Sequence, residues 1–219
     1  MNSPILNING NSVETLEILF IMTLITLAPS IVIMMSSFLR IVVVLSFTRT
    51  SMGIQQTPPN MVLIGIALFL TFFIMNPVIQ TVNSDAYAPY KRGEISQIQA
   101  LERAEKPLKR FMLKQTDPES LNMFVSFSRE EKPINEENLP LTTVIPAFVT
   151  SELKKAFIMG FLIFIPFLII DIIVSSTLMS MGMMMLPPAT ISLPFKILLF
   201  ILVDGWGLLF STLVKSFNI

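Results

Sequence analysis

The sequence contains no cysteine and no histidine, and its 15 basic and 15 acidic residues leave no net charge. Without these two residue types the chain cannot form disulfides, offer a thiol nucleophile, ligate haem through histidine or build the usual zinc sites. It also lacks the side chain that most often serves as a general base near neutral pH, which disfavours an enzyme. Zero net charge gives no electrostatic basis for binding nucleic acid. We therefore expect no metal, no cofactor and no nucleic-acid partner.

Charged residues are scarce and unevenly distributed. They make up 14% of the 219 residues, whereas an average soluble domain has about 25%. Of these 30 residues, 22 lie between positions 85 and 155. Four almost uncharged blocks fill most of the remainder, at residues 16–47, 61–82, 153–179 and 193–217. Since a helix needs about 20 apolar residues to cross a bilayer, this pattern predicts a membrane protein.

The charged stretch divides the chain into three regions. Residues 1–82 hold the first pair of apolar blocks, residues 83–145 form a polar insertion, and residues 146–219 hold the second pair. Within the insertion, Asp117-Pro118-Glu119 is a typical helix start. Apolar residues recur there at helical spacing, namely Ile95, Ile98, Leu101, Ala104, Leu108 and Phe111. We predict an all-α fold of membrane-associated helical hairpins with a mostly helical insertion.

Prolines mark the places where we expect these helices to bend or end. Pro29 interrupts the first block, which we interpret as two helical pieces or one bent helix. The second block should close near Asn76-Pro77, and Pro107 should kink or restart the helix of the insertion. The third block should begin at Pro146.

The orientation in the membrane is suggested by the link between the first two blocks. This link carries Arg49 and no acidic residue, which favours the cytoplasmic side. Four spans would then place both termini and the 83–145 insertion outside the cytoplasm.

Charged residues inside the apolar blocks need partners. Arg40, Asp171 and Asp204 lie where a charge that faces lipid would cost about 2.5 kcal/mol or more. We therefore expect helices that pack against each other or against other subunits. Asp171, Lys196 and Asp204 are candidates for intramembrane pairs, with a role in proton-coupled transport as the alternative.

Two further charges open the third block. Glu152 and Lys155 are three residues apart, close enough to pair on one face of a helix. A structural or intersubunit ion pair is favoured here over a proton relay.

Three strings carry a resemblance to a known family. They are ALFLTFFIMNP at 67–77, PAFVTSELKKAF at 146–157 with FIPFLIID at 164–171, and GMMMLPP at 182–188 with LPFK at 193–196 and DGW at 204–206. Together they closely resemble the FliP family, the flagellar member of the type III secretion export-gate proteins. The resemblance covers nearly the whole chain after about residue 15. Asn76-Pro77 and the string FMLKQT at 111–116 favour the flagellar branch over the virulence branch.

The resemblance implies an all-helical subunit of a pore-bearing export gate in the bacterial inner (cytoplasmic) membrane. Such a subunit assembles with copies of itself and with FliQ and FliR family subunits, and unfolded flagellar proteins pass through the gate. The family places a gasket loop at the string that holds Met183, Met184 and Met185. An aromatic constriction of these gates aligns with Phe111 and Phe124.

The residues themselves leave alternatives open. Methionine is unbranched and polarisable, so it can deform around varied surfaces, and a hydrophobic ring resists wetting. It also fills irregular gaps, and with 15 methionines in the chain composition alone favours this packing role. On sequence alone Phe111 and Phe124 are core residues of small helices. For the methionines, the resemblance favours the gasket role over the packing role.

Two other functions compete with a protein-conducting gate. A small-solute transporter or ion channel subunit would place polar groups at mid-membrane and often shows an internal repeat. Asp171 and Asp204 fit the first expectation, but the two pairs of blocks show no convincing repeat. An intramembrane enzyme would need two catalytic polar residues in one cavity, and the sequence offers no paired-acid motif.

Overall fold

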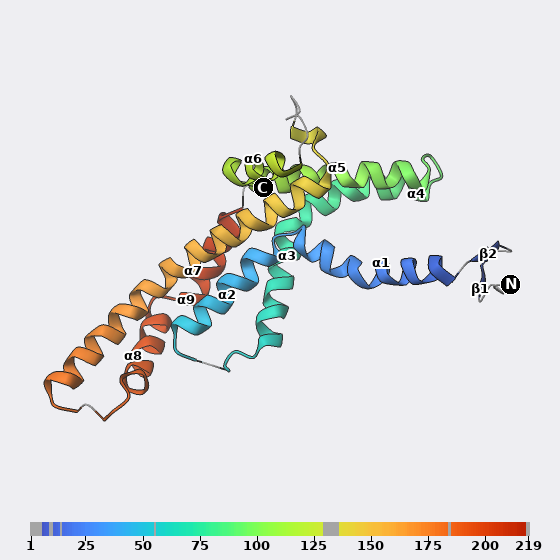
Figure 1. Cartoon of the computed structure of the whole chain (residues 1–219). Coiled ribbons are helices and arrows are strands. Elements are labelled where there is room, and N and C mark those ends of the chain that lie inside the picture. Colours follow the sequence, from blue (N-terminus) through green and yellow to red (C-terminus); the bar gives the residue numbers. More distant parts are fainter. Residues whose placement is uncertain are drawn as a thin grey trace.

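The computed structural model describes residues 6–8, 11–13, 15–54, 56–128, 136–183 and 185–217. Helices make up most of this part of the chain, which confirms the all-α prediction (Figure 1). Two three-residue strands pair antiparallel near the N-terminus, β1 (Leu6–Ile8) with β2 (Asn11–Val13). The helices are α1 (Thr15–Met34), α2 (Phe38–Ser51), α3 (Asn60–Val82), the π-helical turn η1 (Asn83–Tyr87), α4 (Ala88–Lys91), α5 (Gln97–Gln115), α6 (Pro118–Ser128), the 3-10 turn η2 (Glu136–Asn138), α7 (Leu141–Ser180), α8 (Pro188–Leu202) and α9 (Gly205–Lys215).

The first apolar block forms two helices, as one of the two interpretations predicted, but the break falls at residues 35–37 rather than at Pro29. The hydroxyl of Ser36 donates to the carbonyl of Ile33 and accepts from the N–H of Phe38. Such a side chain competes with the helical backbone for its hydrogen bonds. Helix α1 consequently projects away from the other helices, with the N-terminus at its far end (Figure 1).

Prolines end fewer helices than expected. The second block does not close at Asn76-Pro77, because helical structure continues from Asn60 to Lys91. Helix α5 runs through Pro107, and α7 begins at Leu141 and runs through Pro146 and Pro166. A proline removes one hydrogen bond, and packing against neighbouring helices lets the helix continue past it. The predicted start at Asp117-Pro118-Glu119 is confirmed, since α6 begins at Pro118.

Helices α2 and α7 lie side by side, and a glycine permits their close approach. A Cβ atom on Gly160 of α7 would lie 2.5 Å from the ring of Phe47 in α2. The same ring meets Phe157 edge-on at a centroid distance of 5.1 Å. Glycine at this position therefore allows an aromatic side chain of one helix to rest on the backbone of the other.

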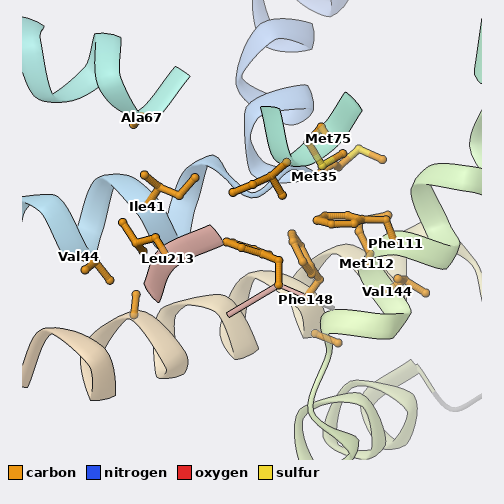
Figure 2. Close-up of a cluster of buried hydrophobic side chains, with 14 of the residues drawn as sticks. Met35, Ile41, Val44, Ala67, Met75, Phe111, Met112, Val144, Phe148 and Leu213 are labelled. Atoms are coloured by element: carbon orange, nitrogen blue, oxygen red, sulfur yellow. The ribbon is translucent and has the colours of Figure 1, made fainter. Parts of the chain in front are cut away.

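The hydrophobic core lies where α2, α3, α5, α7 and α9 meet (Figure 2). Its completely buried members come from all five helices and include Ile41, Ala67, Met112, Phe148 and Leu213. Helix α5 belongs to the polar insertion, so the insertion shares one core with the apolar helices. Only part of its predicted apolar face enters this core, because Ile98 and Leu101 are exposed.

Among the described residues, two helices are long and apolar enough to cross a membrane, Asn60–Lys91 and Leu141–Ser180. Helices α8 and α9 qualify only as a bent pair, with an angle of 63° between them. In the part of the chain that the structure describes, two of the expected four spans are found, or three if the bent pair counts as one. In the first block α2 is only 14 residues long, and α1 contributes a shorter apolar stretch at Ile18–Leu27. The last block is broken at Asp204, whose φ is 50°.

Candidate functional site: a methionine-rich turn and buried ion pairs

Residues 181–187 join α7 to α8, and local backbone chemistry defines this turn. Gly182 has a φ of 74°, a left-handed conformation that favours glycine. The N–H of Met183 donates to the carbonyl of Leu178 at 3.0 Å, which closes the C-terminus of α7. Pro187 and Pro188 then start α8, since proline suits the first turn of a helix.

The methionines of this turn are exposed in the single chain. Met185 is 99% exposed and Met183 is 37% exposed, while Met184 lies outside the described residues. A residue that filled a gap within this chain would be buried, so the packing interpretation does not apply to Met185. The turn presents a flexible apolar side chain that no part of its own subunit covers among the described residues. The predicted gasket role remains a prediction that depends on the assembled gate.

Arg40 and Glu152 form a buried ion pair between α2 and α7. Their side chains are 1% and 0% exposed. The Nε and Nη2 atoms of Arg40 donate to the two carboxylate oxygens of Glu152, with 2.9 Å for the Nε bond. Nη1 donates to the carbonyl and the hydroxyl of Ser216 at 2.8 and 2.9 Å. The ring of Phe217 lies 3.8 Å from Cζ in a cation–π contact. One guanidinium thus holds α2, α7 and the C-terminal end of α9 together.

Glu152 and Lys155, which are close enough in sequence to pair with each other, each form a structural ion pair with a different residue. Lys155 lies 3.3 Å from a carboxylate oxygen of Asp117 and donates to the carbonyl of Gln115. Glu152 faces the core, whereas Lys155 faces the junction of α5 and α6. An ion pair between neighbouring turns of one helix stabilises the helix by only about 0.2–0.5 kcal/mol. The contacts of Glu152 with Arg40 and of Lys155 with the α5–α6 junction therefore form instead.

Asp171 and Lys196 form a second ion pair, between α7 and α8. The Nζ atom of Lys196 lies 2.6 Å from Asp171 Oδ2 and 3.3 Å from the carbonyl of Ser51 at the end of α2. The hydroxyl of Ser192 donates to Asp171 Oδ1 at 2.7 Å. Two of the three charges that were candidates for intramembrane pairs are thus paired within one chain.

Asp204, the third of these charges, is exposed and separate from that pair. It occupies the N-cap position of α9 at the bend between α8 and α9. Its carboxylate lies over the position that a side chain at Gly207 would occupy, so glycine there leaves room for it.

Phe111 and Phe124 occupy different environments. Phe111 is 5% exposed, with its ring centroid 6.5 Å from that of Phe217 and 6.0 Å from that of Phe148. Phe124 is half-buried and meets the exposed Phe127 edge-on at 5.9 Å. Phe111 is thus a core residue of this chain, which is the interpretation that the sequence alone favoured. A constriction role for it remains a prediction and would require it to leave this cluster.

Sequence reasoning missed three residues that complete the two ion pairs. Ser192 lies one helical turn before Lys196 on the same face, a spacing that could have revealed it. Ser216 and Phe217 had no such signal, because their partner Arg40 lies far away in the sequence.

Comparison with known proteins gives a consistent result. The model of the FliP family matches residues 21–213. The flagellar biosynthetic protein FliP of Bacillus subtilis (strain 168) is 54% identical over 207 residues, which cover 94% of each chain. The protein of that name from Aquifex aeolicus (strain VF5) is 50% identical over 211 residues, 95% of this chain and 88% of its own. That of Borreliella burgdorferi is 45% identical over 224 residues, 99% of this chain and 88% of its own.

Proposed function

This chain belongs to the FliP family and is a membrane-embedded component of the flagellar export apparatus, and we propose that it forms part of the pore through which unfolded flagellar proteins cross the bacterial inner membrane. The observation that carries the proposal is the methionine-rich turn, where Met185 is 99% exposed at the tip of a long apolar hairpin. Family membership favours this role over a small-solute transporter or ion channel.

A ring of such turns would act as a gasket. Several copies that each supply Met183, Met184 and Met185 would line a narrow apolar passage, and apolar constrictions resist wetting. Methionine side chains would deform around cargo side chains of any size without offering fixed hydrogen bonds. The passage would therefore exclude ions when empty and admit an unfolded chain.

Assembly with copies of itself and with FliQ and FliR family subunits is part of the proposal. Large aromatic side chains on the two candidate spans are exposed, among them Phe69, Phe73 and Phe161 at 79%, 68% and 62%. Lipid or other subunits could cover these. Ile98 and Leu101 are 71% and 66% exposed on the polar insertion, where lipid would not cover them if the insertion is extracytoplasmic. Contact between subunits would bury them.

Replacement of the three turn methionines with alanine tests the proposal. In the assembled gate we expect Met183→Ala, Met184→Ala and Met185→Ala together to leak small ions while assembly persists. Met61→Ala with Met123→Ala is the matched control, because both are exposed methionines outside the turn. Flux of ions into vesicles that contain the purified complex measures the leak. An ion-tight triple variant would return the methionines to a packing role.

A further inference from the structure

The methionine-rich turn lies at the end of a hairpin that extends beyond the rest of the chain. Figure 1 shows α7 and α8 continuing past the end of α2, with the turn at their far end. Helix α2 accompanies α7 as far as Phe167, which packs with Met52. Beyond that point the outward side chains of α7 are exposed, namely Leu168, Ile169, Ile172 and Ile173. The position of the turn therefore depends on the contacts at the base of the hairpin.

Two groups of contacts form this base. The first is a small apolar cluster of Met52, Phe167 and Phe200. Its two aromatic rings have centroids 6.4 Å apart. Burial of these side chains holds α8 near α7, and the hydrophobic effect that drives the burial has no preferred direction.

The second group is a polar cluster, which is directional. Lys196 on α8 is central, because its Nζ atom reaches Asp171 on α7 and the carbonyl of Ser51 on α2. Ser192, one turn earlier on α8, donates to the other carboxylate oxygen of Asp171. Two successive turns of α8 are thus bonded to one carboxylate, which defines both the rotation and the height of α8 against α7.

The contact with α2 has a clear physical basis. The carbonyl of Ser51 lies at the C-terminus of α2, where carbonyls lack helical partners and the helix dipole is negative. The side chain of Lys196 is 7% exposed and that of Asp171 is 31% exposed. A Cβ atom on Gly53, just after α2, would lie 3.8 Å from the Lys196 Nζ atom. One ammonium group thereby connects three helices at the point where the hairpin leaves the body of the molecule.

We propose that Asp171, Ser192 and Lys196 are positioning residues that set the angle of α8 and so hold the methionine-rich turn at the pore. This inference rests on the proposed gasket function. The competing explanation is that Asp171 and Lys196 only neutralise each other in an apolar environment. A variant that removes both charges leaves no charge to neutralise, but it also removes the contacts that would set the angle of α8. Such a double variant therefore distinguishes the two explanations.

Distance measurements on the assembled complex test the proposal. Spin labels at Thr190→Cys, on the first turn of α8, and Met61→Cys, at the start of α3, report the angle of the hairpin. The chain has no native cysteine, and dilution with unlabelled copies restricts the measurement to single chains. We expect a narrow distance distribution in the parent chain. Asp171→Asn with Lys196→Met should broaden it and add a second, shifted component, and Ser192→Ala should broaden it less.

Lys215→Met is the matched control, since Lys215 is an exposed lysine with no ion pair among the described residues. Its distribution should stay narrow. A double variant that keeps the parent distribution overturns the inference. The chain with both substitutions should still assemble into the complex, because removal of both partners leaves no uncompensated buried charge.

Ion leak through the same complexes distinguishes this inference from the gasket itself. Leak in the double variant together with a broadened distribution supports positioning. If the methionine variants leak while the double variant stays narrow and ion-tight, the gasket stands and the positioning role is wrong. If the double variant broadens and the methionine variants stay ion-tight, the cluster positions the hairpin and the gasket assignment fails.

Discussion

The two ends of α7 are held in different ways. Its first half lies in the core, where Glu152 is completely buried against Arg40 and each guanidinium nitrogen of Arg40 donates a hydrogen bond. Beyond Phe167 its outward surface is exposed, and one lysine on α8 supplies the main polar contact. The same helix is thus anchored at one end and presents a turn at the other. If the proposed gasket function holds, the core end of α7 carries stability and the hairpin end carries function.

Loss of one partner from the core pair should have the largest effect. Arg40→Leu leaves Glu152 buried without a counter-charge, which costs about 3–5 kcal/mol. We expect little assembled complex and a much lower thermal midpoint for what remains. Arg40→Lys should be intermediate, because lysine keeps the charge and loses the paired geometry. A midpoint for Arg40→Leu equal to that of the parent would contradict the role of this pair as an anchor.

Substitutions at Phe111 distinguish a packing role in the core from a constriction role in the pore. Phe111→Ala should cost about 3–5 kcal/mol through the cavity that it leaves in the core. Phe111→Leu should restore most of the stability. Thermal unfolding of the purified complex measures both, with Phe127→Ala as a control because Phe127 is 69% exposed. A stable Phe111→Ala complex that leaks ions would favour the constriction role instead.

A substitution at Gly160 tests how tightly α2 and α7 pack at the core end of α7. Gly160→Ala places a methyl group against the ring of Phe47, and overpacking of this kind costs about 1–3 kcal/mol. Gly65→Ala on α3 is the matched control, since a Cβ atom there meets nothing within 4 Å in this chain. The control should be neutral or slightly stabilising, as alanine is the better helix former. Equal midpoints for the two variants would show that the helices adjust without cost.

The smallest effect should come from an exposed ion pair. Lys154 lies 3.0 Å from Glu119, with side chains 49% and 85% exposed. Solvent screens such pairs and they add little to stability. Lys154→Gln should leave the thermal midpoint unchanged within the error of the measurement. A clear loss would mean that another subunit buries this pair.

Local chemistry explains what the sequence could predict. The helix start at Asp117-Pro118-Glu119 depends on local capping chemistry and occurs where expected, and the turn after α7 lies between the third and fourth apolar blocks. The apolar blocks predicted helices because they are long and almost uncharged. Their ends were less predictable, since tertiary packing lets Pro77 and Pro107 lie inside helices.

Contacts distant in the sequence explain what it could not predict. Arg40 and Glu152 are 112 positions apart, and nothing near either residue identifies the partner. The nearby Lys155 suggested a local pair that the fold does not use. The charges of the candidate site could thus be identified individually, but their pairing depended on how α2, α7 and α8 pack together.

The central claim is that the methionine-rich turn faces the passage of the exported chain. A photo-crosslinking amino acid at position 185, in a gate stalled with an unfolded flagellar protein in transit, tests it most directly. The account predicts crosslinks from position 185 to the stalled chain and none from position 61, which is 85% exposed at the start of α3. Crosslinks from position 185 only to lipid or to other subunits would contradict the claim.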